Sequence, residues 1–332
     1  MNEKTRKIDV HQHMLPGVYT NALAKLGIHS AGGMEFPKWN REGALQMMDE
    51  QDIASGILSI SSPGTHFGDD DAATQLSRVC NEYSASLVQE RPDRFGGFAI
   101  LPMPFLEGSL KEAEYAIDQL KLDGVVLLSS HSDGSYLGDP SFNALMELLN
   151  ERSAIAFVHP TVPVCAPGEA LTIPPYATEF VFDTSRAIIN LIWNGVAEKY
   201  RSIRFIFSHA GGTAPYLAWR WSLLNFSEQM QKNAPKGCIH YLKNFYYDTA
   251  LSGNDYALSA LTQLVSPDRI LFGSDFPFAR PSISVASWKG VKGFAGLSAS
   301  DQQQIAASTA QQLIPRLVQT TVPQNSEKEE SQ

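Results

Sequence analysis

The sequence predicts an α/β protein in which eight parallel strands close into a (β/α)8 barrel, with a small insertion after the first strand. Short apolar segments alternate with amphipathic segments along nearly the whole chain, as in a parallel sheet that is covered by helices. The 332 residues are long for one ordinary domain but normal for one barrel of about 250 residues with insertions. No Gly-x-Gly-x-x-Gly run follows the first strand, which disfavours the alternative, an open doubly wound sheet.

The first strand is expected at residues 8–13, where Ile8 and Val10 favour a strand and a Pro-Gly turn follows. Residues 15–40 are a glycine-containing, loop-rich insertion that is expected to fold over the barrel mouth as a lid or flap. Further apolar runs, most of which end at serine, proline or histidine, predict strands at residues 54–60, 95–100, 124–128, 154–160, 203–209, 244–248 and 270–275.

Apolar side chains at helical spacing predict the helices between these strands. In residues 70–90, for example, Leu76, Val79, Tyr83 and Leu87 recur every three or four residues. By the same pattern or by their place in the alternation, helices are expected at 41–51, 107–121, 139–152, 180–199, 213–231, 254–265, 281–290 and 299–318. One domain therefore covers residues 1–320, and the polar tail 321–332 is expected to be disordered.

Composition excludes several classes of protein. The formal net charge of −9, without a basic stripe, argues against a nucleic-acid partner. No apolar run approaches the roughly 20 residues of a membrane span, and the N-terminus leads directly into the first strand without room for a signal peptide. The three cysteines are scattered, which is typical of reduced thiols and of a cytoplasmic protein.

Chemically active side chains fall where the predicted strands end. His11 and His13 are two apart at the end of the first strand and share one face, His159 ends the fifth strand, His209 the sixth and Asp275 the eighth. Each alone has an ordinary explanation, such as a core histidine or a helix N-cap. Together, at the end of a barrel where active sites form, they offer the three imidazoles and one carboxylate that suit a divalent metal with an open position.

Four motifs carry a resemblance to a known family. They are Asp9-Val10-His11-Gln12-His13, Phe157-Val158-His159-Pro160, Ser208-His209-Ala210-Gly211-Gly212 and Phe272-Gly273-Ser274-Asp275-Phe276-Pro277. In this order over residues 8–315, they resemble the amidohydrolase superfamily, and within it the branch of aminocarboxymuconate semialdehyde decarboxylase. The resemblance implies that His11, His13, His159 and Asp275 bind one metal ion and that His209 is catalytic.

The resemblance also bears on the cofactor. Two-metal members of the superfamily carry a carboxylated lysine at the end of strand four, where this chain has Leu127-Leu128-Ser129-Ser130. One divalent ion is therefore expected: Zn²⁺ suits the ligand set, although Mn²⁺ serves in close relatives. No organic cofactor is expected.

Substrate contacts are suggested by the same branch. The semialdehyde decarboxylase holds carboxylates with two arginines, one of them from its dimer partner. Arg220 stands at the place of the partner's arginine, which implies a homodimer, whereas the other place is taken by Ala44. Trp39, Tyr246 and Phe278 suit a flat aromatic acid, although each one alone could be ordinary core or rim packing.

The chain is most similar to the fungal 6-methylsalicylate decarboxylases of secondary metabolism, notably through Phe245-Tyr246-Tyr247-Asp248-Thr249-Ala250-Leu251. The resemblance implies non-oxidative decarboxylation of an ortho-hydroxy aromatic acid to CO2 and a phenol such as 3-methylphenol. We hypothesise that Asp275 protonates the ring carbon while His209 polarises the phenol oxygen. Alternatives are the semialdehyde decarboxylase itself, a lactonase or amidase in which His209 activates water, and a non-catalytic metal-binding scaffold.

Overall fold

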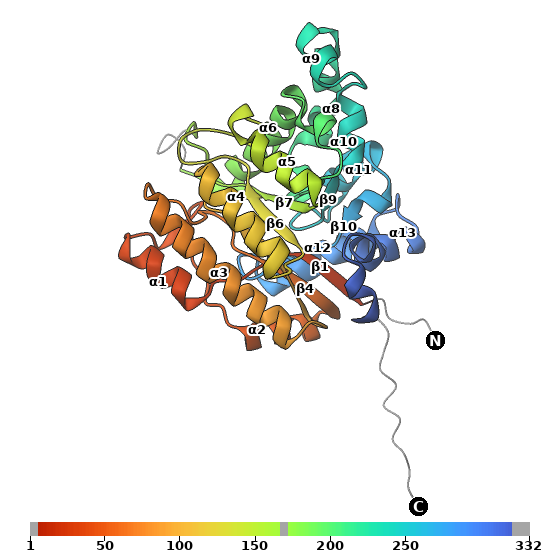
Figure 1. Cartoon of the computed structure of the whole chain (residues 1–332). Coiled ribbons are helices and arrows are strands. Elements are labelled where there is room, and N and C mark those ends of the chain that lie inside the picture. Colours follow the sequence, from red (N-terminus) through yellow and green to blue (C-terminus); the bar gives the residue numbers. More distant parts are fainter. Residues whose placement is uncertain (1–5, 167–171, 321–332) are drawn as a thin grey trace, which may run out of the picture.

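The computed structural model describes residues 6–166 and 172–320 and contains a single parallel sheet of eight strands (Figure 1). Each strand pairs with the next one along the chain, which is the order of a (β/α)8 (TIM) barrel, and the predicted fold class is confirmed. The strands are β1 (Lys7–His13), β4 (Ile53–Ser59), β5 (Phe95–Ile100), β6 (Gly124–Leu128), β7 (Ile155–His159), β8 (Arg204–Phe207), β9 (Tyr246–Asp248) and β10 (Ile270–Leu271).

The barrel closes between β1 and the segment that follows β10. The amide of Val10 donates to the Phe272 carbonyl at 3.0 Å, and the amide of His13 donates to the Phe276 carbonyl at 2.7 Å. The eighth strand was expected to continue to residue 275, but regular pairing ends at Leu271. The chain beyond Leu271 therefore closes the barrel as an irregular segment instead of a regular strand.

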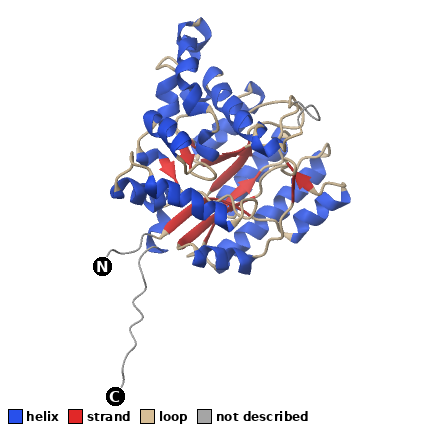
Figure 2. Ribbon diagram, turned by 180° about the vertical axis from the view of Figure 1, so that it is seen from behind, coloured by secondary structure: helices blue, strands red, loops and turns tan. Residues whose placement is uncertain are grey.

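Helices surround the strands, as Figure 2 shows from the opposite side. Side-chain caps begin several of them: Asn40, Asp69 and Asn254 each accept a hydrogen bond from an amide three residues ahead. The main helices are α2 (Arg41–Glu50), α3 (Asp70–Glu90), α4 (Leu106–Glu114), α5 (Asn143–Glu151), α6 (Glu179–Trp193), α8 (Ala214–Ser222), α11 (Asp255–Leu264) and α12 (Pro281–Gly293), and the shorter ones are α7 (Val196–Lys199), α9 (Glu228–Asn233), α10 (Cys238–Asn244), α13 (Ala299–Gln303) and α14 (Thr309–Leu313). Among the described residues, no helix combines the length and the apolar character that a membrane span requires.

The strands are buried on both faces, which explains their nearly continuous apolar sequences. One apolar cluster includes Phe98, Phe157 and Ile206 of the strands together with side chains of α1, α2 and α3, and a second joins the later strands to the helices that cover them. Polar side chains are therefore gathered at the strand ends, where the cores finish.

Two expected helices are broken. Residues 180–199 divide at Gly195, whose φ of 79° stops α6 and starts α7. Residues 213–231 divide into α8, a 3-10 turn and α9, because Ser227 is extended and caps α9 with its hydroxyl. The helix α10 had not been expected, and the tail 321–332 lies outside the described residues.

The insertion after β1 is more regular than expected. It contains α1 (Gly17–Lys25) and a small hairpin of β2 (Ser30–Ala31) and β3 (Met34–Glu35). The hairpin packs against the segment before α6: a Cβ atom on Gly32 would lie 2.6 Å from the Phe180 ring, and the Gly32 carbonyl accepts from the Tyr176 amide at 3.0 Å. Two segments distant in sequence therefore meet over the barrel.

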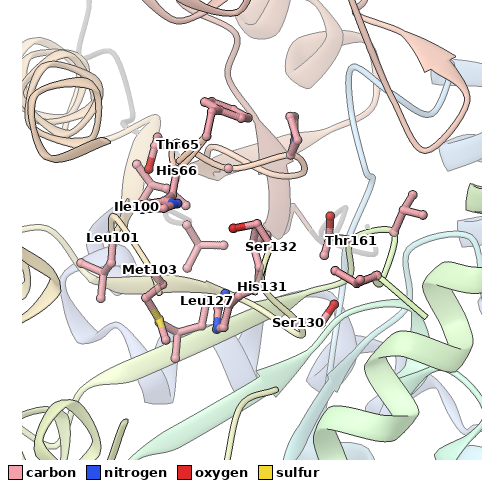
Figure 3. Close-up of a pocket in the computed structure, with 17 residues that line it drawn as sticks. Thr65, His66, Ile100, Leu101, Met103, Leu127, Ser130, His131, Ser132 and Thr161 are labelled. Atoms are coloured by element: carbon pink, nitrogen blue, oxygen red, sulfur yellow. The ribbon is translucent and has the colours of Figure 1, made fainter. Parts of the chain in front are cut away.

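Two neighbouring cavities open at the carboxyl ends of the strands. One, of about 360 Å3, lies between the hairpin, the start of α6 and the segment after β10. The other, of about 210 Å3, lies among the loops that follow β4, β5, β6 and β7 (Figure 3). The first of them is lined by His159, His209 and Asp275, three of the residues that the strand-end pattern predicts to lie together.

Candidate active site

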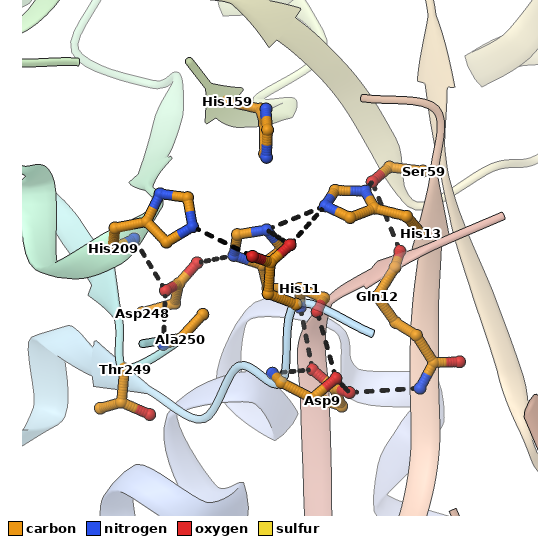
Figure 4. Close-up of polar contacts among 12 residues, drawn as sticks. Asp9, His11, Gln12, His13, Ser59, His159, His209, Asp248, Thr249 and Ala250 are labelled. Atoms are coloured by element: carbon orange, nitrogen blue, oxygen red, sulfur yellow. Dashed lines mark hydrogen bonds and ion pairs between the residues drawn. The ribbon is translucent and has the colours of Figure 1, made fainter. Parts of the chain in front are cut away.

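Three imidazoles and a carboxylate converge at the carboxyl end of the barrel. His11 and His13 come from β1, His159 ends β7, and Asp275 follows β10. One ligand atom from each of these four buried residues lies within 4.8 Å of the others. Figure 4 shows the three imidazoles and His209 pointing toward one another. The sequence-predicted set is thus brought to one point, and the geometry supports its role as a metal site.

The outward-facing nitrogen of each imidazole has a hydrogen-bond acceptor behind it. Nδ1 of His159 donates to the Pro160 carbonyl at 2.8 Å, since a carbonyl can only accept. Nδ1 of His11 donates to Oδ2 of Asp248 at 2.7 Å. Nδ1 of His13 lies 3.0 Å from Oγ of Ser59, whose own hydroxyl donates to a backbone carbonyl. With Nδ1 as the donor, the Nε2 atom of each ring is turned toward the centre, the arrangement that metal-binding histidines use.

Asp275 enters the centre from a strained backbone. Its φ is +60°, its amide donates to the His11 carbonyl at 2.8 Å, and its Oδ1 lies 3.3 and 3.2 Å from Nε2 of His11 and His13. Two residues earlier, a Cβ atom on Gly273 would lie 2.9 Å from the Cβ of His11 and 3.1 Å from Cγ of Asp248. The glycine lets the closing segment pass close enough for the carboxylate to reach the imidazoles.

Electrostatics favour a cation at this point. The carboxylates of Asp248 and Asp275 raise the pKa of His11 to about 10, although burial opposes this shift. Burial acts to raise the pKa of Asp275, yet His11 and the other imidazoles hold it well below its usual range. Burial holds the pKa of His159 well below its usual range, so that ring is neutral. The buried carboxylate of Asp275 therefore favours a positive charge among these rings, and a divalent ion can supply it in place of a proton on His11.

His209 lies beside this group. It follows β8 with a φ of +53°, and its amide donates to Oδ1 of Asp248 at 3.0 Å. Its Nε2 lies 3.5 Å from Oδ2 of Asp275, and neither ring nitrogen has a hydrogen-bond partner. Because His209 also lines the larger cavity, its ring can meet both a bound molecule and Asp275.

Asp248 was missed by reasoning from the sequence. One of its oxygens holds the ring of His11, and the other accepts from the amides of His209 and Ala250. This buried carboxylate thus couples the metal site to the backbone that carries His209. The pattern that found the other residues also applies to it, because Asp248 is the last residue of the seventh barrel strand.

Asp9 was also missed, and its carboxylate holds the segment that follows β10 against β1. It is fully buried and accepts hydrogen bonds from the Ser274 amide at 2.9 Å, from the Ser274 hydroxyl and from the side chain of Gln12. Burial raises its pKa to about 6 despite these donors. The position immediately before Asp275 is thereby tied to β1.

The larger cavity has mainly apolar walls beside these polar groups. Met34 from β3, Tyr176 and Phe180 from the segment around the start of α6, and Phe278 and Ile283 from the segment after β10 contribute to them. Among the described lining residues there is neither arginine nor lysine. The cavity therefore suits a flat apolar molecule whose polar groups are turned toward the imidazoles.

Of the three aromatic side chains that were predicted to contact the substrate, only Phe278 lines this cavity. Phe278 lines the cavity and its ring lies 5.6 Å from that of His13. Trp39 packs instead against Tyr83, with ring centroids 6.3 Å apart. Tyr246 is the first residue of β9, two residues before Asp248. The guanidinium of Arg269 lies over its ring, at the end of the barrel opposite the candidate site. The expectation that Tyr246 faces the mouth is therefore wrong, because the end of β9 that it occupies is the amino end.

Sequence and structure comparisons identify the family. The amidohydrolase family model matches residues 8–316, so the chain belongs to the amidohydrolases and the resemblance stated from the motifs is confirmed. The chain is 33% identical to a 6-methylsalicylic acid decarboxylase of Penicillium expansum over 94% of this chain and 97% of that one.

Solved structures agree with this assignment. A structure described as amidohydrolase II shares a TM-score of 0.88 and 29% identity, covering 93% of this chain and 99% of that one. The fold also matches a dihydroxybenzoic acid decarboxylase from a Polaromonas species, with bound manganese and 2-nitroresorcinol. The TM-score is 0.80 at 22% identity, over 94% and 97% of the two chains.

Proposed function

We propose that this chain is a metal-dependent, non-oxidative decarboxylase of an ortho-hydroxy aromatic acid of the 6-methylsalicylate type, which gives CO2 and a phenol such as 3-methylphenol. The observation that carries the proposal is the position of the three imidazoles, Asp275 and His209 at one side of a cavity that is otherwise largely apolar. The relatives named as decarboxylases bear out the expectation of this reaction.

The ion is held by His11, His13, His159 and Asp275 in this proposal. When bound, it acts as a Lewis acid and as a template for the hydroxyl and carboxylate oxygens of the acid. Three imidazoles and a carboxylate suit Zn²⁺, whereas manganese is bound in the Polaromonas structure, so metal analysis of the purified protein decides between them.

Asp275 and His209 handle the proton. The ring carbon that carries the carboxylate gains a proton, the carbon–carbon bond then breaks with its electron pair returning to the ring, and CO2 leaves as a neutral molecule. The low pKa of Asp275 means that its carboxylate holds a proton only briefly. His209, whose Nε2 is 3.5 Å away and has no other partner, is placed to supply that proton again.

A homodimer belongs to the same proposal. Arg220 is exposed on α8, and the exposed aromatic side chains of Tyr216, Trp219 and Phe226 (84%, 73% and 84% exposed) lie along the same segment. Exposed aromatic side chains gathered on one segment suit a two-fold contact with a second copy. Sedimentation at micromolar concentration should give a dimer, and a fully active monomer would exclude a role for Arg220 in a neighbour's site.

Two alternatives make different demands on the site. The semialdehyde decarboxylase uses two arginines to hold the carboxylates of its substrate. At the position that matches the arginine from the same subunit, this chain has the buried Ala44. A lactonase or amidase consumes water and releases no CO2. The cytoplasmic location and the role in secondary metabolism stay predictions.

The test is a panel of hydroxybenzoates offered to metal-loaded protein. We expect CO2 release from 6-methylsalicylate with one solvent deuterium placed on the ring carbon that loses the carboxylate. Turnover of an ester or amide without CO2 release would reject the proposal in favour of a hydrolase. Preference for the dicarboxylic semialdehyde would instead assign the chain to that other decarboxylase.

A further inference from the structure

The smaller cavity shares a wall with the candidate active site. Ser61 and Ser62, after β4, line the larger cavity, whereas Pro63 and Gly64, the next two residues, line the smaller one. In the same way, His159 lines the larger cavity and Thr161 the smaller one. The hydroxyls of Ser62 and Thr161 are joined by a hydrogen bond of 2.9 Å, so this pair stands between the two cavities.

The smaller cavity is built for an uncharged molecule. Its described lining includes Ile100, Met103 and Val126 among many apolar side chains, and contains no aspartate, glutamate, lysine or arginine. Its two imidazoles are those of His66, bonded to Asp70 at 2.8 Å, and of His131. Without a lysine or an arginine in the wall, an anion such as a carboxylate or bicarbonate would lose hydration with little compensation.

His131 gives the cavity a polar point. Its side chain is more than nine-tenths buried, packs against the ring of Phe142 at 5.2 Å, and leaves Nε2 without a hydrogen-bond partner. Burial lowers its pKa to about 4, so the ring is neutral near pH 7. Figure 3 shows His131 and the hydroxyl-bearing residues Ser130 and Thr161 around the same space. A neutral guest with oxygen atoms that accept hydrogen bonds would satisfy this buried nitrogen.

We propose that this cavity receives CO2, the neutral co-product of the reaction, through the Ser62–Thr161 pair while the phenol leaves by the larger cavity. This inference rests on the proposed decarboxylation. CO2 carries no net charge, is only three atoms long and accepts hydrogen bonds at its oxygens. A space of about 210 Å3 is ample, given that an apolar cavity of about 150 Å3 holds benzene. A change of the χ1 rotamer of Ser62 or Thr161 moves its hydroxyl oxygen aside, so the pair can part without a movement of the backbone.

The consequence for catalysis is a separation of the products. CO2 that remains beside the phenol can add back to the ring, because loss of the carboxylate is reversible in principle. A side cavity on the far side of Ser62 removes CO2 from the metal-binding imidazoles and from the ring. The cavity is then a second product site, distinct from the site of the aromatic acid.

The kinetic test fills the cavity with Val162→Phe. Val162 lines the cavity and is 36% exposed, so the added ring has room to settle. We expect the inhibition constant for dissolved CO2 to rise about fivefold or more, with the KM of the aromatic acid within about twofold of the parent. Val79→Phe, on α3 at 38% exposure and outside the cavity, is the matched control and should leave both constants unchanged. Carbonic anhydrase in the assay keeps CO2 and bicarbonate in equilibrium.

Two results would overturn the inference. A folded Val162→Phe enzyme with an unchanged inhibition constant for CO2 would show that the cavity does not hold it. A parallel rise in the KM of the acid would show that the cavity belongs to the acid's own site. Should Val162→Phe not fold, Ser132→Phe at the exposed rim of the cavity takes its place.

A structural readout separates this inference from the proposed function. Crystals of the metal-loaded protein under CO2 pressure should show a linear molecule near Nε2 of His131, and an empty cavity would reject the inference. If no hydroxybenzoate loses CO2, the proposed function fails, and the pressurised crystal still decides whether the cavity takes CO2.

Discussion

His159 and His131 are both buried imidazoles near the carboxyl ends of neighbouring strands, yet their surroundings give them opposite properties. Nδ1 of His159 donates to a carbonyl, and its ring faces two other imidazoles and the carboxylate of Asp275. The ring of His131 meets Phe142 and apolar neighbours, and its Nε2 has no partner. Position at the barrel mouth alone therefore does not place an imidazole among the residues that could hold a metal ion. A ligand also needs an acceptor behind one ring nitrogen and converging lone pairs in front of the other.

The largest expected effect comes from changing the two histidines in parallel. His159→Ala should lose the bound metal and all measurable activity, because each imidazole supplies one of only four protein ligands. His131→Phe should keep the full metal content. Elemental analysis of both purified variants makes the comparison, and a His159→Ala protein with full metal occupancy would contradict the ligand assignment.

Next in size is the effect of Asp275→Asn at equal metal content. The amide oxygen can still contact a metal, but the amide cannot carry a proton at neutral pH. Activity should fall by about 10²–10⁴-fold, the usual contribution of general acid catalysis, while the aromatic acid still binds. His209→Ala should also retain the metal and lose activity. Near-parental turnover by metal-saturated Asp275→Asn would make His209 the direct proton donor.

A smaller effect is expected at Asp248, which acts through His11. In Asp248→Asn the ring of His11 loses its carboxylate acceptor, and metal affinity should fall by about 10–100-fold. Asp123→Asn, whose carboxylate pairs with Arg316 away from the site, is the matched control. Titration with a competing chelator measures both affinities, and equal values for the two variants would remove Asp248 from the metal site.

The smallest effect concerns stability in acid. The pKa of His131 is about 4 in the folded chain, against an ordinary value of 6.5. Between these two pH values, His131 binds a proton in the unfolded chain but not in the folded chain. This contribution to stability is complete above pH 6.5 and is lost as the pH falls toward 4. Between pH 7 and pH 5, the parent should lose about 2 kcal/mol more unfolding free energy than His131→Phe. Denaturant titrations of the two proteins at both pH values measure this, and parallel losses would show that His131 is protonated in the folded state.

The sequence predicted the barrel well because strands that are buried on both faces must be apolar. It predicted the convergence of the candidate ligands for a related reason: parallel strands all end at one rim, which brings His13 and His159 together. Helix breaks were harder to predict. Ser227 can cap α9 only because its own backbone is extended and no longer continues the helical segment that begins with α8. Tyr246 was expected near the mouth for its aromatic ring, although the expected strand 244–248 ends at Asp248 and only the end of a strand reaches the mouth. Asp248, two residues later in the same motif, is the one that reaches the site.

The meeting of the β2–β3 hairpin with the segment before α6 has a consequence for the range of substrates. Met34, Tyr176 and Phe180, which form much of the apolar wall, belong to segments that carry none of the four residues of the proposed metal site. Part of the cavity wall is therefore encoded apart from the residues that are proposed to bind the metal. Exchange of these two loops as a matched pair, with Gly32 kept for its contact with the Phe180 ring, offers a route to acids with other ring substituents.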